Sequence, residues 1–224
     1  AVMTLYCAID LHSNNNVPVV IDDNDNVLYQ KRLPNQPDKV VAALSPFKDE
    51  LKAVAIESTF NWYWLVDGLN DHHFITQLVN TSAVKQYEGI KHTNDFTDAL
   101  WLAHLMRLNI LPTGYIYPKE QRSLRDLLRK RLQLVRQRVT NILSAQNQFW
   151  RSTGENISTK PIKQTDYSLL NRIKEPNLQH AIKSNFHIIE LLNQEIKSIE
   201  KSVKQQTRSN PICTNLSSVV GIGD

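Results

Sequence analysis

The chain has 224 residues but only two cysteines, Cys7 and Cys213, and only six glycines. Because Cys7 lies in a predicted buried strand and no zinc-ligand spacing is present, the sequence argues against a disulfide framework and indicates a reducing compartment. The low glycine content argues against a loop-rich fold. Every apolar run is far shorter than the roughly 20 residues that span a bilayer, and the N-terminus lacks a signal-peptide pattern. These absences predict a soluble, cytoplasmic protein without a membrane segment.

Hydrophobic residues make up 41% of the chain, which is enough to bury the core of one compact domain beside a more extended part. The net charge of +4 conceals a difference between the two halves. Residues 1–100 carry 7 Lys/Arg and 13 Asp/Glu, whereas residues 101–224 carry 19 and 9. An acidic half suited to cations, joined to a basic half suited to phosphates, indicates a nucleic-acid enzyme; a solvated basic surface is the plain alternative.

The order of apolar segments in residues 1–114 predicts an α/β domain. Three antiparallel strands are expected first, followed by βαβ units. The strands are predicted at residues 5–11, 17–21, 27–33, 53–56 and 74–79, and the helices between them at 37–51 and 61–69. A meander that passes into βαβ units is the ribonuclease H-like (RuvC-like) plan, a mixed sheet with flanking helices.

Four carboxylates, Asp10, Glu57, Asp95 and Asp98, occupy positions where a buried element meets a polar position. Asp10 and Glu57 end strands that should be neighbours, and Asp95 and Asp98 share one face in the first turn of a helix. Buried acids need a cation or hydrogen bonds to compensate them, and Mg²⁺ takes oxygen ligands of this kind. The four acids are therefore predicted to bind metal and to be catalytic. Taken singly, each has a plain interpretation as a solvated strand end, a helix N-cap or a first-turn acid.

Other residues near these acids carry weaker signals. His12 lies two positions after Asp10, yet a histidine beside such carboxylates is as often an outer or surface residue as a ligand. Trp62, Tyr63 and Trp64 suit stacking on nucleic-acid bases, but packing of one helix face into the core is the favoured interpretation.

Residues 115–210 show heptad spacing that predicts a coiled-coil helical region with a polar connector near 152–177. The predicted seam comprises Leu128, Leu132, Val135, Val139, Ile142, Gln146 and Phe149, and then Leu178, Ile182, Asn185, Ile189, Leu192, Ile196, Ile199 and Val203. Two such helices can form an antiparallel hairpin, pair with another subunit, or do both. The pattern does not choose between these possibilities.

Basic side chains flank the first seam and are predicted to contact nucleic-acid phosphates, with solvated salt-bridge positions as the alternative. They are Arg122, Arg125, Arg129, Lys130, Arg131, Arg136 and Arg138.

Several of these segments together resemble a known family, the DEDD transposases of bridge-RNA-guided insertion sequences, which are relatives of the Piv-type DNA invertases. The resemblance is carried by residues 6–10, 55–59 and 91–99, by the Arg/Leu helix from Arg122 to Arg138, and by Val220-Gly221-Ile222-Gly223. The most specific element is Asn-Asp-x-x-Asp-Ala at residues 94–99.

The resemblance implies a RuvC-like domain (residues 1–114), a coiled-coil region (115–210) and the start of a helix-hairpin-helix transposase domain (211–224) that breaks off at the chain end. It implies that the four acids bind Mg²⁺ and that a nucleophilic serine belongs to the later domain. The implied partners are donor and target DNA, a structured guide RNA, and further copies of the chain in a dimer or tetramer. The implied setting is the bacterial cytoplasm, near the nucleoid. Two alternatives stay open: a stand-alone RuvC-like junction or RNA nuclease, and a non-catalytic RNA-binding and assembly module.

Overall fold

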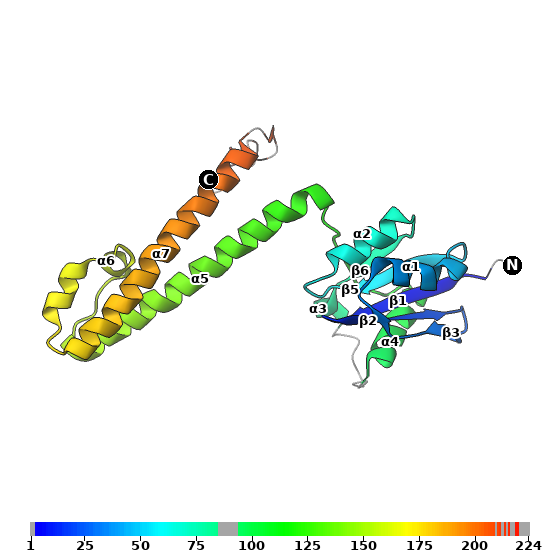
Figure 1. Ribbon diagram of the computed structural model, residues 1–224, viewed down its shortest axis with the longest axis horizontal. Coiled ribbons are helices and arrows are strands. Elements are labelled where there is room, and N and C mark those ends of the chain that lie inside the picture. Colours follow the sequence, from blue (N-terminus) through cyan, green and yellow to red (C-terminus); the bar gives the residue numbers. More distant parts are fainter. Residues whose placement is uncertain are drawn as a thin grey trace. The chain divides into compact units, whose positions relative to one another are not determined.

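The computed structural model describes residues 3–84 and 94–208, together with residues 210, 211, 213, 215, 218 and 219. The chain divides into two compact units, residues 1–116 and 117–224 (Figure 1). The segment Val220 to Asp224, on which the predicted helix-hairpin-helix start depends, lies outside the described residues. So do residues 91–93 of the resemblance motif.

The described part of unit 1 contains one mixed sheet of seven strands in the order β3-β2-β1-β5-β6-β7, with β4 also pairing with β2. β1, β2 and β3 are antiparallel, β1, β5 and β6 are parallel, and β7 is antiparallel to β6. The strands are β1 (Leu5–Leu11), β2 (Asn15–Ile21), β3 (Val27–Gln30), β4 (Leu33–Pro34), β5 (Leu51–Glu57), β6 (Thr76–Val79) and β7 (Thr113–Gly114). A meander joined to parallel crossovers is the ribonuclease H-like arrangement, and the predicted fold class is confirmed.

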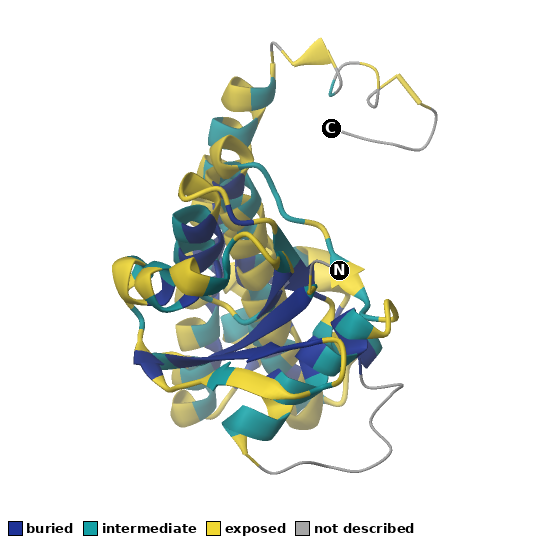
Figure 2. Cartoon of the chain, turned by 90° about the vertical axis from the view of Figure 1, so that its right-hand side faces the viewer, coloured by how far each residue is buried: buried dark blue, intermediate teal, exposed yellow. Residues whose placement is uncertain are grey.

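Helices cover both faces of this sheet. α1 (Pro37–Leu44) and α2 (Tyr63–Asp71) pack on one face, where Ile9 of β1 and Ile56 of β5 are buried. α4 (Asp95–Arg107) packs on the other face, and the short α3 (Thr81–Val84) contributes Val84 there. All seven residues of β1 are buried, which explains why that strand reads as a continuous apolar run. Figure 2 shows the central strands in dark blue.

Four alanines lie in the contact between the sheet and α4. Ala8 of β1 and Ala55 of β5 belong to the same buried cluster as Ala99 and Ala103 of α4, beside larger side chains such as Val19, and all four alanines are fully buried. Because alanine adds only a methyl group, the helix backbone can lie close to the strands. This alanine layer holds α4 near the carboxyl ends of β1 and β5.

Two predicted elements of unit 1 have different bounds in the structure. The helix predicted at 37–51 ends at Leu44, and Ser45–Phe47 forms a 3₁₀ turn. Pro46 explains this, because proline lacks the amide hydrogen that would continue the helix. The strand predicted at 27–33 is divided into β3 and β4, which both pair with β2.

Unit 2 is a helical hairpin built from α5 (Lys119–Thr153) and α7 (Pro176–Thr207). The two helices run antiparallel, since Arg131 of α5 contacts Glu200 of α7 while Arg138 contacts Asn193. The connector carries two short elements, α6 (Thr159–Lys163) and a 3₁₀ helix (Tyr167–Arg172). α5 ends at Gly154, whose φ of 73° is the left-handed conformation that glycine adopts without strain.

The predicted seam on α7 is the buried face of that helix, with Ile182, Ile189, Leu192 and Ile196 all buried. Phe186, which lies outside the predicted heptad positions, is buried as well.

On α5 the buried face differs from the prediction. Ile142 and Phe149 are buried as expected, but the first half of the helix buries Leu134. Leu128, Leu132 and Val139 are 44%, 46% and 46% exposed. These three residues of the predicted seam therefore lie on an apolar face of α5 that α7 leaves exposed, whereas Val135 packs against the cluster of Leu134 with α7.

Among the described residues, none of the helices combines the length and the apolar character needed to cross a bilayer.

Candidate metal-binding site

Asp10 and Glu57 lie next to each other at the carboxyl ends of two parallel strands. Ile9 pairs with Ile56, so the following residue on each strand is an acid. Side chains alternate between the faces of a strand, which places both acids on the face covered by α4. Asp10 is almost fully buried, with 4% of its side chain exposed.

Glu57 holds a proton beside Asp10 when no cation is present. The pKa of Glu57 is raised to about 8, because the carboxyl is desolvated, hydrogen-bonded to Asp10 and exposed to the negative charges of Asp10 and Asp98. A hydrogen bond from the Leu11 backbone opposes this rise. Glu57 therefore carries a proton at neutral pH unless something positive replaces it.

The third acid of this group, Asp95, comes from the first turn of α4. The helix is capped by Asn94 and Thr97, whose side chains each accept a hydrogen bond from the other's backbone N–H. Since Asn94 serves as the N-cap, Asp95 does not have the capping role that was its plain alternative. Its side chain is available to the site.

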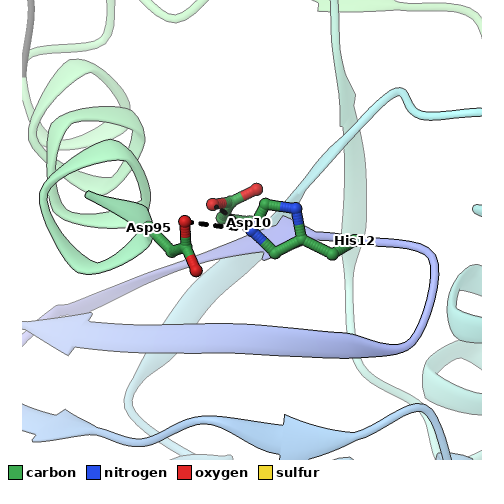
Figure 3. Close-up of side chains that lie close together, drawn as sticks. All are labelled: Asp10, His12 and Asp95. Carbon is green, nitrogen blue, oxygen red and sulfur yellow. Dashed lines mark ion pairs between the residues drawn. The ribbon is translucent and has the colours of Figure 1, made fainter. Parts of the chain in front are cut away.

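His12 forms ion pairs with both Asp10 and Asp95 (Figure 3). Its Nε2 atom is 3.1 Å from Oδ2 of Asp10 and 3.3 Å from Oδ1 of Asp95. Arg32 also contacts Asp95, and its Nη2 atom is 2.5 Å from Oδ2 of Asp95. The hydrogen bond from Arg32 is the main cause that lowers the pKa of Asp95; partial desolvation opposes it, and the charges of His12 and Arg32 add to the lowering.

A set of asparagines holds the loop that carries His12. The backbone carbonyl of His12 accepts hydrogen bonds from Nδ2 of Asn35 and of Asn61, each at 3.0 Å. Its backbone N–H donates to the carbonyl oxygen of Asn15, whose side-chain oxygen accepts from Arg32. The backbone of His12, which carries the imidazole, is thus held by Asn15, Asn35 and Asn61.

Asp98 is exposed and lies one turn further along α4 than Asp95. It is close enough for its charge to raise the pKa of Glu57. In the described part of the chain, the group of metal-ligand type whose atoms all lie within 4.8 Å of one another is Asp10, His12 and Asp95. The structure therefore gathers the four predicted acids at one end of the sheet, with Asp10 and Asp95 closest to a common point.

Sequence reasoning gave His12 little weight and overlooked Arg32. The short spacing from Asp10 was a usable signal for His12, but nothing in the sequence showed that the hairpin would return it toward Asp95. Arg32 is distant from both acids in the sequence and reaches Asp95 because β4 pairs beside Asn15 and Asn16.

The donor set fits a hard divalent cation. Carboxylate oxygens are the ligands that Mg²⁺ and Mn²⁺ take, and here they belong to acids that are crowded, partly buried and held in place by Arg32, His12 or the proton on Glu57. Asp10, Glu57, Asp95 and Asp98 are the residues that would hold such an ion.

The basic residues of α5 differ in their surroundings. Arg122 is buried and donates from Nε to the Tyr117 carbonyl oxygen at 2.8 Å. Arg125 lies over the Tyr117 ring, 4.6 Å from its centroid. Arg131 pairs with Glu200.

Three others are exposed along the helix: Arg129, Lys130 and Arg136. The last of the predicted set, Arg138, is half-buried and donates to Oδ1 of Asn193 at 2.9 Å.

A ribonuclease H-like sheet that gathers carboxylates at the ends of two parallel strands defines a nuclease-like domain. A transposase family model, that of the DEDD transposases of the IS110 type, matches residues 7–149. That match covers more than half of the chain, and the chain belongs to this transposase family, whose members act on DNA.

No curated protein matches the chain. Among solved structures, the large terminase nuclease from the thermophilic phage G20c is similar at 13% identity, with a TM-score of 0.31. The similarity covers 50% of this chain and 57% of that one.

The proton on Glu57 leads to a prediction about stability. Because the folded chain holds this proton up to a pH of about 8 and the unfolded chain only up to about 4.5, the free energy of unfolding falls as pH rises through that interval. Glu57→Gln, which cannot ionise, should remove this fall. At pH 8 and without metal we expect the variant to be more stable by about 2 kcal/mol, a value reduced for screening by water.

Urea unfolding in EDTA at pH 5 and pH 8 measures the effect. Exposed Glu50 provides the matched control, and Glu50→Gln should leave the pH dependence as it is. Equal pH dependence in the wild type and Glu57→Gln would contradict the proton on Glu57.

Proposed function

We propose that this chain is the metal-binding part of an insertion-sequence transposase that carries out DNA strand exchange under the direction of a guide RNA. Mg²⁺ is the proposed cofactor, held by Asp10, Glu57, Asp95 and Asp98. The observation that supports this most strongly is the meeting of acids from β1, β5 and α4 at one end of the sheet in a chain that belongs to a transposase family. Guide RNA, donor DNA and target DNA are the proposed partners, on the strength of the family resemblance.

The chain's own residues suggest how a phosphodiester would be handled. A bound divalent cation supplies Lewis-acid activation of a phosphoryl oxygen. Asp10 and Asp95 would fix the position of the cation, and Glu57 would release its proton to solvent when the cation takes its place. Arg32, half-exposed beside Asp95, is placed to meet the negative charge of the phosphate. In this proposal, a serine outside the present sequence supplies the nucleophile, so the chain alone binds metal and nucleic acid without completing recombination.

Replacing Asp10 tests the role of the acids. Asp10→Asn keeps the shape of the side chain but removes a charged ligand, and we expect metal-dependent strand exchange by the full-length transposase to fall by about a hundredfold or more. Guide-RNA binding should stay at the wild-type level. Unchanged strand exchange would favour the alternative of an RNA-binding and assembly module.

Asp38→Asn, at an exposed acid of α1, is the control. A stand-alone nuclease is the other alternative, and it would require this chain by itself to cleave branched DNA or RNA in Mg²⁺. Loss of that cleavage in Asp10→Asn would then favour the nuclease.

The exposed basic side chains of α5 are the proposed contacts to nucleic-acid phosphates. In the part of the chain that the structure describes, Arg129 and Arg136 have neither an ion pair nor a side-chain hydrogen bond, whereas Arg131 pairs with Glu200. They lie two turns, or about 10 Å, apart on the same flank of the helix, so both can reach the phosphates of one nucleic-acid backbone. Arg129, Lys130 and Arg136 carry this part of the proposal most directly.

We therefore expect the double change Arg129→Ala and Arg136→Ala to weaken binding to DNA or RNA of any sequence. Because each arginine releases about one counterion, the slope of log affinity against log salt should fall by about 2. Fluorescence anisotropy over a salt series measures this slope. Arg131→Ala is the matched control on the same helix, and a double variant with the control's slope would refute the contact.

A further copy of this chain is the proposed partner for the uncovered apolar face of α5. Leu128, Leu132, Val139 and Leu143 recur at helical spacing along this face and are 44–52% exposed. A helix face with heptad spacing is suited to an identical helix, since knobs and holes then match. We propose a homo-oligomer, a dimer or tetramer, formed through α5.

A charge in this face should separate the copies. Leu132→Glu places a carboxylate where two such faces would meet, and we expect the mass in multi-angle light scattering to fall to that of one chain. Leu191→Glu is the control, because Leu191 is an exposed leucine of α7 outside this face. An oligomer that persists in Leu132→Glu would exclude the face as the interface.

A further inference from the structure

His12 is placed as a member of the metal site rather than as a bystander. Its Nε2 atom is buried, although 38% of the side chain is exposed, so the ring presents this nitrogen to the interior. Two carboxylate oxygens lie within 3.3 Å of Nε2, one from Asp10 and one from Asp95. Nε2 pairs with both oxygens, but within the described residues neither contact has the angles of a well-formed hydrogen bond.

Two ligand atoms of one cation lie close together without forming a hydrogen bond to each other. In an octahedral site with metal–ligand distances of about 2.1 Å, neighbouring ligand atoms lie about 3 Å apart along an edge, and each is directed at the metal rather than at the other. The distances of 3.1 Å and 3.3 Å from Nε2 to the two oxygens correspond to two such edges. All three ligand atoms lie within 4.8 Å of one another, as ligands of a single cation do.

The loop makes this placement firm. Hydrogen bonds from Asn35 and Asn61 fix the His12 carbonyl, and the His12 N–H is bound to Asn15. Both backbone polar groups of His12, its N–H and its carbonyl, are therefore hydrogen-bonded. A ligand held in this way loses little freedom when an ion binds.

We propose that Nε2 of His12 is a nitrogen ligand of the cation that Asp10 and Asp95 bind. This inference rests on the proposed metal site and extends it to a residue outside the four acids. Imidazole nitrogen suits borderline ions better than Mg²⁺, whereas carboxylate oxygen suits both. His12 accordingly shifts the preference of the site toward Mn²⁺ relative to a site made of carboxylates alone.

A purely structural role for His12 makes a different claim. As a spacer that neutralises Asp10 and Asp95, the imidazole would leave the site when the cation arrives, and no nitrogen would be bonded to the metal. The two roles are separated by a measurement that detects nitrogen in direct contact with the ion.

The test uses the whole chain loaded with one equivalent of Mn²⁺ and electron spin-echo envelope modulation, which reports ¹⁴N bonded to Mn²⁺. We expect ¹⁴N modulation in the wild type and its replacement by the ¹⁵N pattern when the histidines are ¹⁵N-labelled, a comparison that needs no substitution. His12→Ala should abolish the modulation, while His104→Ala, at a histidine paired with Asp25, should retain it.

Titration calorimetry with Mn²⁺ and Mg²⁺ gives a second readout. His12→Ala should weaken Mn²⁺ binding by about tenfold or more and Mg²⁺ binding by less. Bound Mn²⁺ without ¹⁴N modulation in the wild type, or with modulation that survives in His12→Ala, overturns the role of His12 and leaves the acids' site standing. If the wild type binds no Mn²⁺ and no Mg²⁺, the proposed metal site itself fails.

Discussion

The parallel pairing of β1 with β5 is the constraint on which the rest of the site depends. Aligning Ile9 with Ile56 brings the carboxyl ends of the two strands together, and the next residue on each strand is an acid on the same face of the sheet. Two partly buried carboxyl groups repel each other when both are charged. Glu57 avoids this repulsion because its raised pKa leaves it protonated at neutral pH. Asp95, Arg32 and His12 then add charges of both signs around this pair.

Charge compensation differs between the two units. In unit 1 the acids are compensated by a proton on Glu57 and by the nearby side chains of Arg32 and His12. In unit 2 the charged groups are largely on the surface of a hairpin held by apolar packing around Phe149 and Phe186. The charge balance of unit 1 therefore changes as Glu57 titrates, whereas the fold of unit 2 depends on apolar contacts.

Much of the fold could be predicted from the sequence, because its strongest signals are local. β1 and β5 each contain a run of apolar residues, 5–9 and 53–56, and the acid that follows each run is visible in the sequence. The errors arose where local patterns met tertiary packing. Pro46 ends α1 early, and the first half of α5 turns Leu134 rather than Leu132 toward α7.

The part of the site that escaped prediction depends on loops. Whether His12 points toward Asp95 is decided by amide hydrogen bonds from Asn35 and Asn61, and such long-range contacts have no periodic trace in a sequence. The acids, in contrast, lie on strands and on a helix. The face that each acid occupies follows from the side-chain period of that element. The acids on the strands and on α4 could therefore be predicted from the sequence, whereas the position of His12 in its loop could not.

The alanine layer between α4 and the sheet has a consequence for the chemistry. Ala8, Ala55, Ala99 and Ala103 set the distance between helix and strands, and that distance also separates Asp95 from Asp10. In the proposed metal site, these four methyl groups would therefore set the span between the carboxylates. A larger side chain anywhere in this layer would move α4 away from the strands, and an ion of fixed radius would then be out of reach of one carboxylate although all of the acids were still present.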